Sequence, residues 1–383
     1  METRVLLCGM GGYGENYVRE FLERDVPVAG SVLAGIADPF AENSPLYPAV
    51  VERGIPVYDS MDGFFAHDTA DLTVISSPIH THYPYVMSAL EHGSNVLTEK
   101  PVCFDPDQFS RMMGKSRESG LFVAVGYQLC FSKDVIALKK DILKGVYGKP
   151  VRMKTIRLMR RNDIYYGRSG WAGAMLCKGE PVYDSPFTNA CAHQYQNMVF
   201  LLGKEMDQSA STVSCKGILA KIRPDITNCD TASLEFRTSE GVVLQYHASH
   251  AVDEAKVGPL SVYEFENGTV VQDDRGFIGN LRDGSTIDYT SVDKGERLEK
   301  LWESIRCVRE KRVPVCTLKT AFEHTHAVLM AQAMGVTDLS DHALARRDDK
   351  DSVYYTLDGL GNELVNAYAQ WRIADISKSK KVV

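Results

Sequence analysis

The sequence lacks the features that mark secreted, membrane-embedded or nucleic-acid-binding proteins. Its nine cysteines are scattered singly without C-x-x-C pairs, so neither a disulfide framework nor a zinc site is indicated. No apolar run is long enough to cross a bilayer, and no charged and then apolar leader follows Met1. A net charge of −7 does not suit a nucleic-acid partner. We therefore expect a cytoplasmic protein that binds no metal, membrane or nucleic acid.

The composition provides material for a sizeable core, with 44% apolar and 24% charged residues among 383. A chain of this length predicts two domains. Strand and helix patterns alternate up to residue 127, and alternating strand patterns follow after it. We expect a first domain over residues 1–127 and a second over residues 128–383.

The first domain has the pattern of a doubly wound α/β sheet. Residues 4–8 form an apolar strand, residues 15–24 an amphipathic helix and residues 32–38 a second strand. The same alternation continues with further strands and helices, namely strands at 72–76, 95–98 and 122–126 and helices near 85–92 and at 107–118. Such alternation predicts a parallel Rossmann-type sheet.

A glycine motif, Gly9-x-Gly11-x-x-Gly14, lies between the first strand and the first helix. Gly9 would permit the tight turn, Gly11 the close approach of a pyrophosphate, and Gly14 close packing of helix and sheet. Around Gly12 and Tyr13 the start of the helix would offer N–H groups to the phosphates. A tight turn without a ligand is the alternative interpretation, but the strand before and the helix after favour a dinucleotide site.

Asp38 ends the second strand and should accept hydrogen bonds from the adenosine ribose. It should also repel a 2′-phosphate by roughly 4 kcal/mol, for a separation of about 4 Å and an effective dielectric constant of about 20. Residues 39–44 include no arginine or lysine that could receive that phosphate. The sequence therefore predicts NAD rather than NADP as cofactor.

Two later strand ends carry polar residues on the ligand-binding side of such a sheet. Ser77, Pro78 and His82 lie where the nicotinamide ribose would sit, although His82 fits equally well as a polar residue in the first turn of a helix. Lys100 ends another strand and should point into the crevice beside the cofactor, and Pro101 then terminates that strand. A lysine paired with Glu99 at a surface strand end is the structural alternative.

With these motifs the sequence resembles the Gfo/Idh/MocA family of glucose–fructose oxidoreductases and inositol dehydrogenases. The resemblance rests on short matching segments, which are the glycine loop, residues 36–38, Ser77-Pro78 with His82, Glu99-Lys100-Pro101, residues 126–128, His193 and residues 202–203. It implies that Lys100 is the catalytic lysine. It also implies that Glu99, Lys100 and Gln128 belong to the cofactor site.

The second domain has the pattern of a large, open and mostly antiparallel sheet. Strands are predicted at 151–158, 232–237 and 242–249, and Asn267-Gly268 signals a further hairpin. One face should pack on helices, while the other should be free and carry Gln245 and His247. The resemblance implies subunit contacts through that face, and hence a homodimer or homotetramer. A closing helix over 352–372 can pack back on the first domain.

A helix is expected from Pro186 to about residue 202, with Asp184 and Ser185 before it. On this helix Asn189, His193 and Gln196 would form one polar stripe among apolar residues. The resemblance implies that His193 is an acid/base group and that Asn189 contacts substrate where many relatives have aspartate. The alternative for His193 is a hydrogen-bonded core histidine.

The segment 160–173 combines arginines with aromatic side chains, among them Tyr166, Arg168 and Trp171. Such side chains suit the faces and hydroxyls of sugars, although a loop packed over the sheet explains them equally well. We therefore expect an NAD-dependent dehydrogenase that acts on a secondary ring hydroxyl of a sugar, a glycoside (at C3) or a cyclitol. The alternatives are an NAD-dependent glycosidase that works by transient oxidation and elimination, and a non-catalytic regulator that senses sugar or NAD.

Overall fold

The computed structural model describes residues 2–23, 30–291 and 297–376. The chain forms two compact units: Met1–Ser132 with Gly295–Ala321, and Lys133–Lys294 with Phe322–Val383. The sequence pattern did not indicate that a segment near residue 300 returns to the first unit, because the expected division placed everything after residue 127 in a second domain. Helix α10 (Leu318–Gln332) begins in the first unit and continues in the second.

The first unit contains a six-stranded parallel sheet with strand order β3-β2-β1-β4-β5-β6. Its strands are β1 (Thr3–Cys8), β2 (Ser31–Ala37), β3 (Val57–Tyr58), β4 (Leu72–Ile75), β5 (Asn95–Thr98) and β6 (Val123–Val125). The strand order reverses between β1 and β4, and in such sheets ligands bind at the carboxyl ends of the strands beside this reversal. The predicted Rossmann-type sheet is confirmed.

The first unit also contains helices, most of which connect these strands. They are α1 (Gly14–Glu23), α2 (Tyr47–Glu52), α3 (Met61–Phe65), α4 (His82–Glu91), α5 (Pro106–Ser119) and α9 (Glu299–Glu310), with 3₁₀ turns η2 (Ala41–Asn43), η3 (Ile79–Thr81) and η4 (Gln128–Phe131). The Asp105 carboxylate caps α5 by accepting from two backbone N–H groups, and Gly120 ends it with φ of 70°.

The second unit contains a nine-stranded sheet with strand order β16-β15-β14-β13-β7-β12-β11-β10-β17. Its strands are β7 (Pro150–Met159), β10 (Thr212–Lys221), β11 (Thr231–Thr238), β12 (Val243–Ser249), β13 (Lys256–Phe265), β14 (Gly268–Asp273), β15 (Gly276–Leu281), β16 (Thr286–Asp288) and β17 (Val336–Asp338). The pairs β7–β12 and β10–β17 are parallel, and every other neighbouring pair is antiparallel. The predicted mostly antiparallel sheet and its Asn267-Gly268 hairpin are confirmed.

The remaining elements of the second unit are helices, short turns and two small hairpins. They are α6 (Lys133–Leu143), α7 (Asp163–Tyr166), α8 (Ala192–Leu201), α11 (Leu360–Ala369), η5 (Tyr289–Ser291), η6 (Ser340–His342), β8 (Leu176–Cys177) with β9 (Glu180–Pro181), and β18 (Leu344–Arg347) with β19 (Val353–Thr356). The expected closing helix over 352–372 was too long, because β19 occupies its first part. Among the described residues, no helix is both long and apolar enough to cross a membrane.

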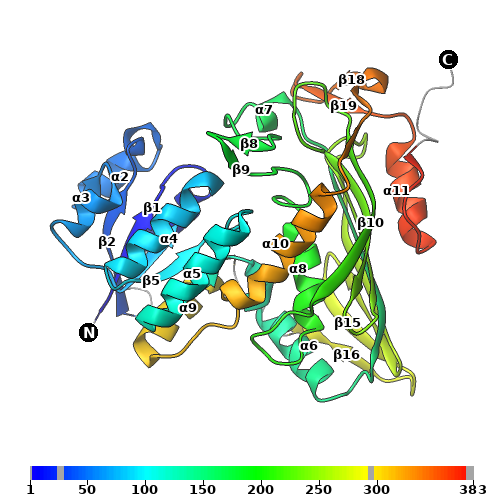
Figure 1. Cartoon of the computed structure of the whole chain (residues 1–383), viewed down its shortest axis with the longest axis horizontal. Coiled ribbons are helices and arrows are strands. Elements are labelled where there is room, and N and C mark those ends of the chain that lie inside the picture. The colour runs from blue at the N-terminus through cyan, green and yellow to red at the C-terminus, as the bar shows by residue number, and fades with distance from the viewer. Residues whose placement is uncertain (1, 24–29, 292–296, 377–383) are drawn as a thin grey trace. The chain divides into compact units, whose positions relative to one another are not determined.

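The expectation of a free sheet face at β12 was wrong. Figure 1 shows α8 on one side of the sheet and α11 on the other. Gln245 is 2% exposed and His247 is fully buried, with its ring against that of Tyr368 on α11. The apolar face of α11, with Leu360 and Leu364, joins the core beneath the sheet. This burial holds α11 on the second unit. The sequence analysis had left open that the closing helix packs on the first domain.

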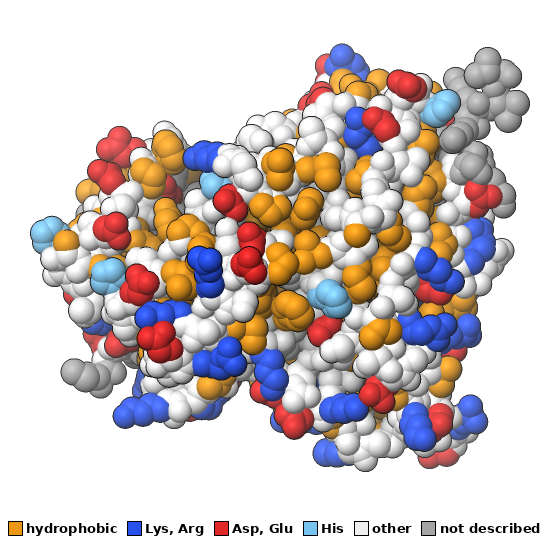
Figure 2. All heavy atoms as spheres, viewed as in Figure 1, with side chains coloured by type: hydrophobic (Ala, Val, Ile, Leu, Met, Phe, Trp, Pro, Cys, Tyr) orange, Lys and Arg blue, Asp and Glu red, His pale blue; other side chains and the backbone are white. Residues whose placement is uncertain are grey.

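Charged side chains are distributed without a large field of one sign on the face shown in Figure 2. Lysine and arginine side chains alternate there with aspartate and glutamate side chains. A nucleic-acid-binding face concentrates basic residues instead. This face therefore has no such footprint.

Candidate functional site

The glycine loop between β1 and α1 forms a concave backbone surface, which side chains at the glycine positions would fill. Gly9 and Gly12 adopt φ of +87° and +58°, which disfavours any side chain there. A Cβ atom on Gly14 would lie 2.1 Å from the carbonyl oxygen of Gly9, so only glycine permits this packing. In contrast, a Cβ atom on Gly11 or Gly12 would meet no atom within 4 Å. The loop thus leaves open space over its backbone, as a bound pyrophosphate requires.

Asp38 follows β2 and lies against this loop. Its carboxylate accepts hydrogen bonds from the backbone N–H groups of Met10 and Phe40, each at 2.9 Å. These two bonds orient the carboxylate and use only part of its capacity, because an ionised carboxylate offers about four acceptor positions. The residues present therefore fit a dinucleotide whose ribose hydroxyls donate to Asp38.

Tyr13 and Gln128 are the other predicted cofactor residues near these strand ends. Tyr13 precedes α1, and its ring lies edge-on to Tyr17 at 5.8 Å between centroids and 4.5 Å from the ammonium group of Lys300. Burial raises the pKa of the Tyr13 hydroxyl. Gln128 begins η4, shortly after β6. The contribution of either residue to cofactor binding stays a prediction.

His82 holds the ends of β4 and β5 together. Its Nδ1 lies 2.8 Å from the carbonyl oxygen of Pro101, and its Nε2 lies 2.9 Å from that of Ser77. Burial lowers the pKa of this imidazole, although its backbone contacts oppose that effect. Pro78 precedes η3, and the Ser77 hydroxyl bonds that of Thr81 at 2.6 Å. Because both ring nitrogens of His82 contact the backbone, the geometry favours the structural interpretation of this residue.

Glu99 follows β5 and forms a buried ion pair with Lys300, which lies 201 residues further along the chain on α9. The side chains of Lys300 and Glu99 are 1% and 12% exposed. The Glu99 carboxylate also accepts from the Tyr17 hydroxyl at 2.6 Å and from the Lys100 backbone N–H at 3.4 Å. Burial alone would raise the pKa of Glu99, but the Lys300 charge and these bonds outweigh it and lower the pKa.

The buried position of Glu99 differs from the surface pair that was the structural alternative for Lys100. Glu99 pairs with Lys300, and the charge of Lys100 also lowers the pKa of Glu99. Lys100 itself lies directly after this carboxylate, where its peptide bond to Pro101 is cis. Sequence reasoning missed Lys300, and the only available signal was a lysine among the apolar residues on the buried face of α9.

In the second unit, Asp184 organises the predicted substrate residues. Its carboxylate accepts from the Asn189 side-chain amide at 2.8 Å and from the Gly173 backbone N–H at 2.7 Å, and it lies 3.7 Å from the Arg168 guanidinium. The Asp184 side chain is 2% exposed. The sequence analysis placed Asp184 only before the start of a helix. The available signal was an acid directly before Ser-Pro.

The predicted helix over 186–202 begins later than expected, at Ala192. Ser185 and Thr188 exchange hydrogen bonds between hydroxyl and backbone, and such local bonds compete with the helical ladder. Asn189 therefore lies in a turn before α8, while His193 lies in the first turn of the helix. Gln196 is fully buried and donates to the Ser209 hydroxyl at 3.1 Å. The predicted polar stripe of three residues on one helix was wrong.

The segment 160–173 forms a cluster of rings and cations. The guanidinium of Arg168 lies 3.7 Å from the ring centre of Tyr165 and 5.1 Å from that of Trp171. The Tyr166 hydroxyl lies 3.2 Å from Nδ1 of His250, a residue that sequence analysis missed. Burial and then the charges of nearby arginines hold the pKa of His250 well below its usual range. His250 therefore joins this cluster through its hydrogen bond with Tyr166.

The predicted catalytic residues belong to different units, Lys100 to the first and His193 to the second. Their action on one substrate stays a prediction. Within the described residues, no group of three or more His, Cys, Asp or Glu side chains is arranged to hold a metal ion.

Comparison with known proteins gives matches in sequence and in structure. Residues 3–127 match the GFO_IDH_MocA family model, described as "Oxidoreductase family, NAD-binding Rossmann fold". The chain is 27% identical over 206 residues to inositol 2-dehydrogenase 4 of Saccharopolyspora erythraea, covering 54% of this chain and 55% of that protein. It is 24% identical over 234 residues to D-glucoside 3-dehydrogenase of Escherichia coli, covering 61% and 60%. These matches thus span little more than half the length of the curated relatives.

A solved structure shares the fold over most of both chains. The WlbA dehydrogenase of Bordetella pertussis, determined with NADH and UDP-GlcNAcA, superimposes with a TM-score of 0.69 at 20% sequence identity. The superposition covers 86% of this chain and 95% of that one. At this identity the likeness concerns the fold. The matching family model and the glycine loop indicate that the first unit carries an NAD-binding Rossmann domain like that of the Gfo/Idh/MocA oxidoreductases.

Proposed function

We propose that this protein is an NAD-dependent dehydrogenase that oxidises a secondary ring hydroxyl of a sugar, a glycoside or a cyclitol. The observation that carries the proposal is the shared position of the glycine loop, Asp38 and Lys100, which all follow the carboxyl ends of strands in one parallel sheet. In this type of sheet that edge holds the dinucleotide and the reacting groups.

Lys100 would bond the reacting hydroxyl and receive its proton. NAD, when bound, supplies the acceptor for the hydride that leaves the same carbon. The Glu99–Lys300 pair holds the backbone on which Lys100 stands, since the Glu99 carboxylate accepts from the Lys100 N–H. A group held by buried contacts keeps its reactive atom in place, which is what acid/base catalysis requires.

In the second unit, His193 would act as the second acid/base group and Asn189 would orient the ring. Asparagine cannot stabilise an imidazolium as a carboxylate does. The Asp184 carboxylate, however, lies 2.8 Å from the Asn189 amide nitrogen and fixes the orientation of that amide. We infer that Asp184 is the acid of this site, acting on substrate through Asn189.

The substrate class follows from the rings and cations of segment 160–173. Trp171 offers an aromatic ring, and Arg168, whose guanidinium lies against the rings of Tyr165 and Trp171, offers donors to hydroxyl oxygens. Similarity to proteins named inositol 2-dehydrogenase and D-glucoside 3-dehydrogenase supports cyclitols and glycosides, including reaction at C3 of a glycoside. We also propose a homo-oligomer that uses the exposed parts of the large sheet.

A panel of sugars, glycosides and inositols with NAD tests the proposal, with absorbance of the reduced cofactor as the readout and the Lys100→Met variant as the control. Reduction of NAD by one substrate class, lost in the variant, is the expected result. Glycoside cleavage without accumulation of NADH would point to the glycosidase instead. Saturable NAD and sugar binding without turnover would point to a regulator.

A further inference from the structure

A cavity of about 600 Å³ lies in the first unit, at the sheet edge opposite the glycine loop. Asn95 and Val123, the first residues of β5 and β6, belong to its wall, whereas Glu99 and Gly126 follow the last residues of these strands. Since a strand rises about 3.3 Å per residue, the four residues of β5 span about 13 Å. The cavity is therefore distinct from the dinucleotide site.

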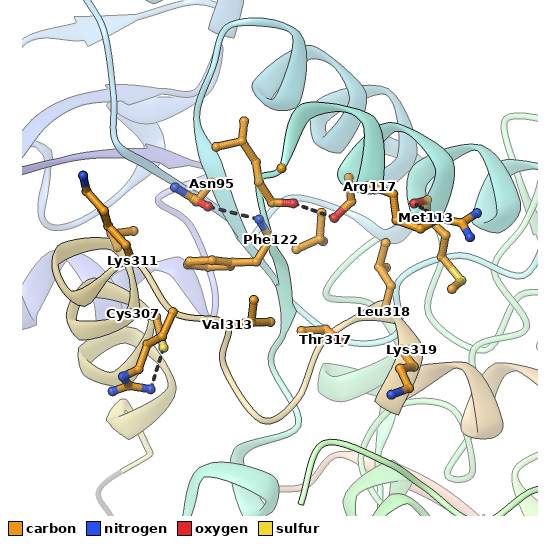
Figure 3. Close-up of a pocket in the computed structure, with 16 residues that line it drawn as sticks. Asn95, Met113, Arg117, Phe122, Cys307, Lys311, Val313, Thr317, Leu318 and Lys319 are labelled. Atoms are coloured by element: carbon orange, nitrogen blue, oxygen red, sulfur yellow. Dashed lines mark hydrogen bonds between the residues drawn. The ribbon is translucent and has the colours of Figure 1, made fainter. Parts of the chain in front are cut away.

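The interior of the cavity is apolar. Two helices, α5 and α9, end beside it, and the segment after α9 passes along it (Figure 3). The apolar side chains that line it include Met113, Leu121, Phe122, Val123, Val308 and Leu318. Val313 also lines it, although this side chain is 65% exposed. A volume of this size lined by apolar side chains is typical of small-molecule sites.

Cations surround this apolar interior. Four of the lining residues are basic, namely Arg117, Lys311, Arg312 and Lys319, and none is acidic. In Figure 3, Phe122 and Val313 lie at the centre of the group, with Arg117, Lys311 and Lys319 around them. This charge arrangement favours an anion.

Two of these cations are available to a ligand. Arg312 is neutralised by Glu303 and Glu310, each at 2.5 Å. Arg117 and Lys311 are exposed, and neither has a carboxylate partner among the residues that the structure describes. A ligand carboxylate could therefore pair with them without displacing an acid of the protein.

The ends of α5 and α9 differ, and the comparison shows that Lys311 adopts an unfavourable backbone conformation. α5 ends at Gly120 with φ of 70°, the usual choice for a left-handed residue at a helix end. α9 ends instead at Lys311 with φ of 53°, a backbone conformation that side chains rarely adopt. A cation in the last turn already suits the helix dipole, so the dipole does not require a lysine at this strained position.

We propose that this cavity binds a small amphipathic monoanion, a medium-chain carboxylate whose apolar body fills the interior and whose charge pairs with Lys311 and Arg117. A polyphosphate is disfavoured, because α5 and α9 present their carbonyl ends to the cavity, and phosphates bind at helix N-termini. A ligand carboxylate at the rim would contact the two cations. Its single negative charge would then lie away from the carbonyl ends of α5 and α9.

Calorimetric titration of the whole protein with octanoate tests the proposal. The wild type should bind one octanoate saturably, and saturating NAD should not displace it. The double variant Arg117→Ala/Lys311→Gly should bind octanoate about threefold to tenfold more weakly, as expected for two partly exposed ionic contacts. Glycine suits the backbone at position 311, so this variant should fold as the wild type does.

Arg111→Ala is the matched control, because Arg111 is an exposed cation of the same helix outside the cavity wall. It should leave octanoate affinity unchanged. Uncharged 1-octanol should bind more weakly than octanoate to the wild type and equally to all variants. Absence of saturable octanoate binding, or equal affinity in the wild type and the double variant, would overturn the proposal.

Discussion

The Glu99–Lys300 pair makes a quantitative prediction. In Lys300→Met, the buried Glu99 carboxylate loses the counter-charge of Lys300, while its hydrogen bonds from the Tyr17 hydroxyl and the Lys100 N–H remain among the residues that the structure describes. Removing one partner of a buried pair costs about 3–5 kcal/mol. Because two hydrogen bonds to the charge remain, we expect a loss near the lower end, about 3 kcal/mol at pH 7.

The assay is urea denaturation of the wild type, Lys300→Met, Glu99→Gln and the double variant. The double variant removes both charges and should lie within about 1.5 kcal/mol of the wild type, since a neutral replacement leaves no isolated charge behind. Lys115→Met is the control, because its partner Glu118 is 73% exposed. That substitution should cost less than about 1 kcal/mol.

The stability difference between wild type and Lys300→Met should depend on pH. The pKa of Glu99 is lowered in the folded protein, so its stabilisation is complete above the unfolded value of about 4.3. It is lost as pH falls through the folded pKa, and the difference between the two proteins should shrink there. A loss below about 1 kcal/mol at pH 7, or an equal loss in the double variant, would refute the reasoning.

Three further predictions concern the site. Lys100→Ala should lower turnover by about 10²–10⁴-fold, and near-normal turnover would remove the proposed role of Lys100. The wild type should have a kcat/KM several hundred-fold higher with NAD than with NADP. Asp38→Asn should reduce that ratio, because it removes the charge that repels a 2′-phosphate by roughly 4 kcal/mol. Equal kcat/KM for both cofactors in the wild type would contradict this. Asp184→Asn should destabilise the protein by about 1–3 kcal/mol in urea denaturation, because the new amide keeps a single acceptor oxygen and one of the two donors loses its acceptor; unchanged stability would show that Asp184 does not organise the loop.

The sequence was a reliable guide where structure depends on neighbours along the chain. The glycine loop, the acid at the end of β2 and the lysine at the end of β5 were all recognisable, because turn geometry and strand ends are set by a few consecutive residues. The alternation of apolar residues likewise predicted both sheets, since side-chain direction follows the period of each element. For the same reason α5 was predicted to within a residue or two at each end.

Packing between distant segments decided the rest. No local pattern indicates that Lys300 meets Glu99, because that contact depends on which face of α9 is buried against the sheet. The start of α8 was set by hydroxyl bonds between Ser185 and Thr188, which compete with a helix that the apolar pattern alone favours. From the sequence alone, His247 on β12 was expected to lie on a free face of the sheet. In the structure α11, more than 100 residues later in the chain, covers this side chain. Periodicity reports which residues share a face, whereas only the folded chain decides what that face contacts.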